Sequence, residues 1–213
     1  MKLINTMALL LLFIFMSNTK LHATEETAKY LGSQEYQKSL YDLGVYWDRK
    51  VLKLQENCMG QYTINPISFA IIKPLKFSGA NTTPIDGVWT FRYKFTRCGE
   101  SITYNALNIA RDNQKPQIVS LVPGTTKCDP ILLKDVYSGV YANLAIHNIK
   151  NNTTCKTATV LDTEVTMPQT IQNKNWEEKW TILECDKKVE TAFCFVPSEK
   201  NGGTTWILGK CKQ

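Results

Sequence analysis

Histidine is scarce in this 213-residue chain, and its scarcity limits the chemistry that the chain can perform. The two histidines are His22 and His147, and only His147 lies beyond the N-terminal segment. A Ser-His-Asp or Cys-His unit would therefore have to use His147, and no serine or cysteine at a characteristic spacing marks its partner. His147 also falls on the apolar stripe of an expected helix, a position typical of a core or interface histidine. We find no recognisable catalytic residue.

Acidic residues give no clearer indication of chemistry. Glu177 and Glu178 are neighbours on an expected strand, so they point to opposite faces and cannot act together as the paired carboxylates of a glycosidase. We expect both, with Glu184, to be solvated strand charges. No two cysteines form a Cys-x-x-Cys pair, so we expect no metal site. Gly202-Gly203 fits a hairpin rather than a phosphate loop, and no cofactor is expected.

Basic residues form the best candidate binding surface. Arg92 and Lys94 alternate onto one face of an expected strand, Arg97 follows them, and Lys73 and Lys76 lie on the preceding extended segment. Such a stripe could meet an anionic lipid surface or an acidic protein. The alternative is an ordinary solvated sheet face.

The N-terminal segment indicates export. Lys2 precedes ten apolar residues, Met7 to Met16, and a small residue, Ala23, stands at the end of the segment, as in a secretory signal peptide. Ten residues rise only about 15 Å as a helix and cannot cross a ~30 Å hydrocarbon core. We expect removal of residues 1–23 to leave a secreted or periplasmic protein without a transmembrane segment. Loss of Lys2 and Lys20 lowers the formal charge from +6 to +4, and no basic run indicates a nucleic-acid partner.

The remaining chain is predicted to be a tandem duplication. Landmarks recur in the same order in both halves: Gly44-Val45-Tyr46 and Gly139-Val140-Tyr141, then Cys58 and Cys155, then Trp89 nine residues before Cys98 and Trp176 nine residues before Cys185, and finally Lys127-Cys128 and Lys210-Cys211. This order divides the chain into a first repeat, residues 24–128, and a second repeat, residues 129–213.

Each repeat is predicted to contain one helix followed by about four antiparallel strands, an α+β fold. Apolar residues recur every three or four positions at the start of each repeat, after the N-cap residues Ser33 and Asp129. The period then changes to two, clearest from Trp89 to Thr96. The glycine inside each helix predicts a close approach of helix to sheet. This element order resembles the helix-wrapped-by-sheet plan of cystatin-like and nuclear-transport-factor-like modules.

The second repeat carries a more specific resemblance. Its Trp176-x-Glu178-x-Trp180 run, Cys185 and Gly202-Gly203-Thr204 resemble the tail of a group of uncharacterised secreted bacterial proteins. The Asp that follows Cys185 departs from that group's Cys-Gly turn. The resemblance implies a secreted module without an activity to carry over. It also implies pairing of the cysteine after the helix with the cysteine at the turn, hence Cys58–Cys98 and Cys155–Cys185.

The other cysteines can be placed from the sequence itself. Cys194 and Cys211 lie on either side of the Gly202-Gly203 turn and are expected to pair across that hairpin, which leaves Cys128 as a free thiol. Disulfides are the ordinary use of cysteine in an oxidising compartment. A rival scheme joins each turn cysteine to the Lys-Cys pair at the end of its own repeat, giving Cys98–Cys128 and Cys185–Cys211.

Two hypotheses about function remain, and they belong to different classes. The first is an exported bacterial, non-catalytic binding protein, host-directed or in the envelope, that engages a protein or an anionic lipid. The second is a small hydrolase-like enzyme with a pocket between helix and sheet. The surroundings of His147 distinguish them. A buried histidine without a carboxylate or hydroxyl partner favours binding, and a histidine that opens into a cleft beside such a partner favours an enzyme.

Overall fold

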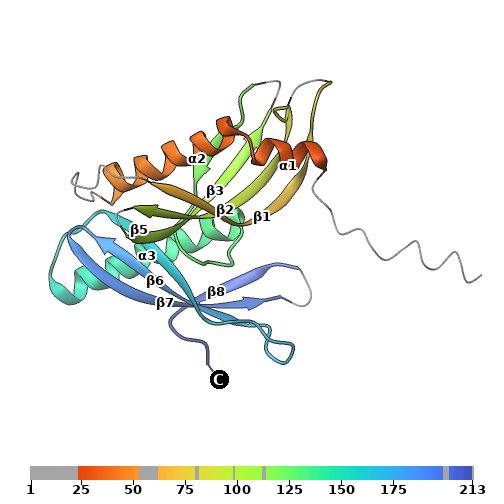
Figure 1. Ribbon diagram of the computed structural model, residues 1–213. Coiled ribbons are helices and arrows are strands. Elements are labelled where there is room, and N and C mark those ends of the chain that lie inside the picture. The colour runs from red at the N-terminus through yellow and green to blue at the C-terminus, as the bar shows by residue number, and fades with distance from the viewer. Residues whose placement is uncertain are drawn as a thin grey trace, which may run out of the picture.

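The computed structural model describes residues 24–52, 62–79, 82–97, 99–111, 114–198 and 202–212. These residues form an α+β fold with two four-stranded antiparallel sheets, each associated with helices (Figure 1). The strand orders are β1-β2-β3-β4 and β5-β6-β7-β8, so the two halves share one topology. This agreement is consistent with the predicted duplication of a helix-plus-sheet module.

The first module begins with two helices and a wider turn. They are α1 (Glu25–Leu31), α2 (Gln34–Tyr46) and the π-helical η1 (Trp47–Val51). Four strands follow: β1 (Thr63–Lys76), β2 (Asp86–Arg97), β3 (Glu100–Ala110) and β4 (Gln117–Ser120). The predicted N-cap Ser33 accepts a hydrogen bond from the backbone N–H of Tyr36 at 3.2 Å. Helix α1 was not predicted, because its two turns are too short to show a period.

The second module has one long helix, α3 (Pro130–Asn151), followed by β5 (Ala158–Met167), β6 (Trp176–Glu184), β7 (Lys187–Pro197) and β8 (Thr204–Leu208). The predicted N-cap Asp129 accepts hydrogen bonds from the backbone N–H groups of Ile131 and Leu132. Within the described residues, no helix is long and apolar enough to cross a membrane.

The central hairpins of the two modules have the same register. Arg97 faces Glu100 across the β2–β3 turn, and Glu184 faces Lys187 across the β6–β7 turn. Residues at equivalent distances from the two turns therefore occupy equivalent places in the two sheets. This correspondence makes a residue-by-residue comparison of the modules meaningful.

Each sheet packs one face on its own helix to form a separate core. In the first core, the aromatic residues of β2, from Trp89 to Phe95, pack on Tyr36 and Leu40 of α2. The helix glycines lie where helix and sheet are closest, as predicted. A Cβ added at Gly44 would lie 2.8 Å from the ring of Phe95, and one added at Gly139 would lie 2.6 Å from that of Trp206.

The two modules pack against each other through the sheet face of the first module that points away from α2 (Figure 1). The linker between them contributes directly, because Thr125 donates its backbone N–H to the carbonyl of Thr163 on β5 at 2.6 Å. Thr163 in turn donates its hydroxyl to the carbonyl of Pro123 at 2.7 Å. The linker therefore runs along β5 and fixes the edge of the second sheet to the first module.

Candidate functional site

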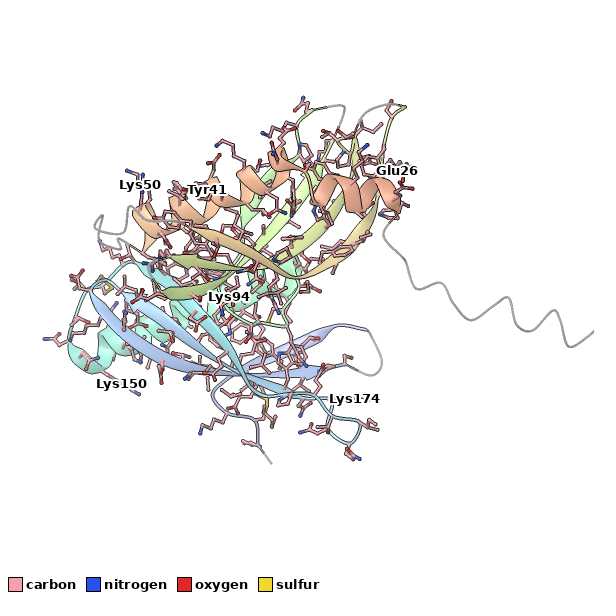
Figure 2. The ribbon with its side chains drawn as sticks, in the orientation of Figure 1. Glu26, Tyr41, Lys50, Lys94, Lys150 and Lys174 are labelled. Atoms are coloured by element: carbon pink, nitrogen blue, oxygen red, sulfur yellow. A yellow bond between two sulfur atoms is a disulfide. The ribbon has the colours of Figure 1, made fainter. Side chains whose placement is uncertain are left out.

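The five basic residues of the expected binding stripe do not gather on one surface. Lys73 and Lys76 both lie near the carboxylate of Asp86, at 2.6 and 3.7 Å. Lys94 is exposed on the sheet face opposite α2 (Figure 2). Arg97 points to the other face, where it is only 7 % exposed. Arg92 and Lys94 share one face of β2, as expected, but Arg97 does not lie on that face.

Arg92 helps to hold the two modules together and is not part of a free binding surface. Its side chain is half-buried and donates hydrogen bonds to Asn105 at 2.7 Å and to the carbonyl of Thr126 in the linker. Asn105 also donates to the carbonyls of Val122 and Gly124, at 2.8 and 3.0 Å. Arg92 and Asn105 together hold the linker against the first sheet.

The Trp-x-Glu-x-Trp run places Glu178 between the two tryptophans whose indole groups bind its carboxylate. Its carboxylate is fully buried and accepts the indole N–H groups of Trp176 and Trp180, both at 2.9 Å, and the backbone N–H of Lys127 at 2.8 Å. The expectation that Glu178 is a solvated strand charge is therefore wrong. Because side chains alternate along a strand, Glu178 shares the core face with both tryptophans. The three N–H donors replace the water that a buried carboxylate loses.

Glu184 is also buried, and here too the expectation of a solvated charge is wrong. Its side chain is on the core face at the end of β6, under the last turns of α3, and the residue is 7 % exposed. Asn143 on α3 donates to it at 3.3 Å and to the hydroxyl of Thr191 at 2.9 Å. The second carboxylate oxygen lies 2.7 Å from Nδ1 of His147. We call Asn143, His147, Glu184 and Thr191 the open cluster.

His147 opens into a cleft beside a carboxylate. Its side chain keeps 30 % exposure and lines a cleft of about 450 Å³ at the C-terminal end of α3. The other lining residues are Asn148, Asn151, Thr153, Thr154, Cys155, Glu184, Cys185, Asp186, Lys187 and Val189. A histidine that opens into a cleft beside a carboxylate is the arrangement expected of the hydrolase-like alternative. The sequence did not reveal this contact, because the partner of His147 comes from a strand 37 residues away.

The first module places a closed cluster at the equivalent site. Asp48 in η1 is 2 % exposed and lies 2.6 Å from Nε of Arg97. Tyr104 on β3 donates its hydroxyl to the same carboxylate at 2.6 Å. Burial raises the pKa of Asp48 above its ordinary value, against the opposing effects of Tyr104 and Arg97. Burial and the neighbouring Asp48 also raise the pKa of Tyr104. We call Asp48, Arg97 and Tyr104 the closed cluster.

The two clusters occupy matching positions in the duplication. Each has one helix residue four positions after the helix glycine, one strand residue directly before the turn cysteine and one strand residue six positions after that cysteine. The fourth position, eight residues after the glycine, is Leu52 in the first module and His147 in the second. The matching pairs are Asp48 and Asn143, Arg97 and Glu184, Tyr104 and Thr191, and Leu52 and His147.

A larger groove, of about 680 Å³, lies between the modules. The end of the β2–β3 hairpin forms one wall, and β5, β6 and β7 form the other. Its apolar lining is Leu52, Ile102, Leu161 and Leu183, and its hydroxyl groups come from Ser101, Thr103, Thr125, Thr163 and Thr181. The charged lining residues are Arg97, Glu100, Asp162, Glu164 and Lys188.

The groove carries an excess of negative charge. The charge of Arg97 is matched by Asp48, and Glu164 lies 3.0 Å from Lys179. Asp162 has no ion pair within the part of the chain that the structure describes. Although this residue as a whole is exposed, desolvation of its carboxyl raises its pKa. The groove therefore offers a partly desolvated carboxylate beside aliphatic walls.

The structure forms two of the expected disulfides, Cys155–Cys185 and Cys194–Cys211. The rival scheme is wrong for Cys185, which bonds to Cys155, and for Cys128, which is a buried free thiol. Burial raises the pKa of Cys128, so the thiol is kept protonated and unreactive. The expected Cys58–Cys98 bond lies outside the described residues.

Comparison with protein-family models, with curated proteins and with solved structures finds no match to this chain. The function is therefore inferred from the geometry of the groove and of the cleft.

Proposed function

We propose that this protein is exported and acts by binding, and that the groove between its two modules is the ligand site. The observation that carries the proposal is the groove itself, which requires both modules. Its volume of about 680 Å³ falls in the range of ligand pockets, and its mixed aliphatic and hydroxyl lining is typical of them. The two disulfides are in keeping with an oxidising compartment outside the cytosol.

The charge of the groove indicates the class of ligand. Asp162 follows Leu161 on β5 and pairs with Thr181 on the neighbouring strand β6. Leu183, also on β6, lines the same groove. A ligand with a positively charged group and an aliphatic part would satisfy the carboxylate and cover the leucines at once. The dispersal of the basic residues argues against the anionic lipid surface that the sequence suggested. We therefore propose a cationic amphiphile as the ligand class.

Titration calorimetry with dodecyltrimethylammonium, dodecyl sulfate and dodecyl maltoside, each below its micelle concentration, tests this proposal. We expect the cationic probe to bind most tightly. Asp162→Asn should weaken its binding about tenfold, which is about 1.4 kcal/mol, and Leu183→Arg should abolish it. Lys73→Ala lies outside the groove and serves as the control. Equal binding of the cationic probe to the wild type and to Leu183→Arg would exclude the groove as the site.

The same titrations, repeated over a range of pH, test the role of Asp162. A cationic ligand binds the ionised carboxylate of Asp162, and the pKa of this carboxyl is raised in the free protein. Affinity should therefore be constant at neutral pH and fall as the pH drops through that raised pKa. Asp162→Asn should lose this dependence. Export itself is tested by the intact mass of the protein made in its native host, which should lack residues 1–23.

A specific observation favours a second candidate function, a small hydrolase-like activity in the cleft of the second module. The observation is the contact of 2.7 Å between Nδ1 of His147 and the carboxylate of Glu184. A histidine oriented by a buried carboxylate is a common device for general base catalysis. Release of product from a panel of chromogenic esters, compared between the wild type and a heat-denatured sample, tests this candidate.

A further inference from the structure

We propose that His147 is the general base of this second candidate function, that Glu184 and Asn143 position it, and that the substrate is a small neutral ester with several hydroxyl groups. The inference rests on the hydrolase-like activity proposed above and names its residues and substrate class. It is carried by the geometry of the open cluster and by the contrast with the closed cluster.

The hydrogen bonds of the open cluster orient the imidazole. The bond to Glu184 places the proton of the neutral ring on Nδ1 and leaves the lone pair on Nε2. Glu184 cannot turn away, because Asn143 donates to its other oxygen and is held in turn by Thr191. Asn151 donates to the carbonyl of His147 at 2.9 Å and braces the end of the helix. The ring is thus fixed at the wall of an open cleft.

The closed cluster shows that the fold does not need a histidine at this place. The first module has the same hairpin register and the same helix glycine, yet Leu52 stands where the second module has His147. Its carboxylate is neutralised by a buried arginine within the same cluster. The second module has instead a carboxylate whose partner is a titratable ring that reaches solvent. A carboxylate paired with a titratable ring that reaches solvent is what a proton-transfer site requires.

The lining of the cleft indicates the substrate. Asn151, Thr153 and Thr154 offer amide and hydroxyl groups, which pair with the hydroxyl groups of a sugar or polyol in either direction. Asp186 and Lys187 oppose each other in charge, so the cleft favours a neutral molecule. A volume of about 450 Å³ admits a single acylated ring. We therefore place an acylated sugar or polyol in the cleft.

The reaction is a hydrolysis by water. Nε2 of His147 takes a proton from a water molecule as the water oxygen bonds to the ester carbonyl carbon, whose oxygen becomes negatively charged. Lys187, which also lines the cleft, supplies positive charge for this oxyanion. The carbonyl then re-forms, the bond to the sugar oxygen breaks, and the protonated imidazole returns its proton to that oxygen. The products are a carboxylic acid and a free hydroxyl, and no other reactant is needed.

Steady-state kinetics on acetylated glucose, with released acetate as the readout, test the inference. His147→Leu installs the residue that the first module carries at the matching position, so the variant should fold. We expect it to lower kcat at least 100-fold, in line with the usual contribution of a general base. Glu184→Gln and Asn143→Ala should lower kcat about tenfold with KM unchanged, because they position the base without touching the substrate. Ile149→Ala, at an exposed position of α3 outside both the cleft and the groove, is the control and should change neither constant.

The outcomes separate the two proposals. Turnover by the wild type that persists in His147→Leu would show that the hydrolase acts elsewhere and would overturn the inference. A rise in KM without loss of kcat in Glu184→Gln would also overturn it, because a positioning residue acts on kcat. No turnover by the wild type on any ester would overturn the hydrolase-like function itself and leave the binding function standing.

Discussion

The closed cluster of the first module and the open cluster of the second solve the same packing problem in different ways. In both, the helix passes over the end of the central hairpin, where the core meets solvent. The first module fills this place with an ion pair between Asp48 and Arg97, and neither side chain is more than 9 % exposed. The second module has a negative charge at the strand position, from Glu184, where the first module has the positive charge of Arg97. Asn143 and a part-exposed His147 form hydrogen bonds to this carboxylate.

The difference between the two clusters shows which polar groups stabilise the fold and which are available for proton transfer. A buried ion pair whose two members satisfy each other offers no free proton acceptor. A carboxylate paired with an imidazole keeps the site polar and leaves a nitrogen for proton transfer. Duplication thus supplies an internal reference, because one copy shows what the fold alone requires.

The largest effect is expected from breaking the ion pair of the closed cluster. Arg97→Met should lower the free energy of unfolding by about 3–5 kcal/mol, because it leaves the buried Asp48 without its positively charged partner. Urea denaturation followed by tryptophan fluorescence measures the change. The double variant Asp48→Leu with Arg97→Met should recover most of the loss. Glu184→Gln in the open cluster should cost only about 1–2 kcal/mol, since a hydrogen-bonding side chain remains. Equal costs in the two modules would contradict the distinction.

The next effect concerns the disulfides of the second module. Removing Cys155–Cys185 by a double alanine substitution should cost about 2–4 kcal/mol of unfolding free energy. Removing Cys194–Cys211 should cost about 0.5 kcal/mol less, because the enclosed segment spans 17 residues rather than 30. Thermal unfolding of the two variants, side by side, measures the difference. A larger loss from the shorter loop would show that chain entropy does not set the order.

A smaller effect is expected at the helix glycines. Gly139→Ala adds a Cβ that would lie 2.6 Å from Trp206 and 2.9 Å from Phe193, so the helix must move away from its sheet. Overpacking of about 1–3 kcal/mol should outweigh the gain of about 1 kcal/mol in helix propensity. Gly44→Ala should cost less, because the nearest atoms to its added Cβ, at 2.8 Å and beyond, belong to the single ring of Phe95. Urea denaturation compares the two variants, and stabilisation by either one would contradict the close approach.

The smallest effect on stability is expected from exchanging the residues that distinguish the modules. Leu52→His should change the unfolding free energy by less than about 1 kcal/mol, because Leu52 is only partly buried. His147→Leu should cost about 1 kcal/mol, because the buried Glu184 loses one hydrogen bond and keeps the one from Asn143. The same denaturation experiment measures this change. A loss above about 3 kcal/mol in His147→Leu would make the histidine a structural member of the open cluster.

Periodicity along the chain determined much of the fold. The spacing of apolar residues located α2, α3 and the central hairpins, because a helix or strand with one buried face repeats its apolar residues at its own period. The capping roles of Ser33 and Asp129 were also local, since each side chain bonds to backbone within three residues. The Cys194–Cys211 bond followed from the symmetry of its positions about a turn. The shared landmark order predicted the duplication.

The polar sites were decided only by the tertiary structure. The alternation of strand residues already placed Glu178 with Trp176 and Trp180, and it could have signalled a buried carboxylate. It could not show the whole set of partners, because the third donor to Glu178, the backbone N–H of Lys127, comes from a linker 51 residues away and the partners of Glu184 come from another element. Alternation alone separates Arg92 from Arg97, but packing decided which face meets a helix and which meets the other module. A charged side chain is free or structural according to its neighbours in space, and those neighbours are set by packing between distant segments.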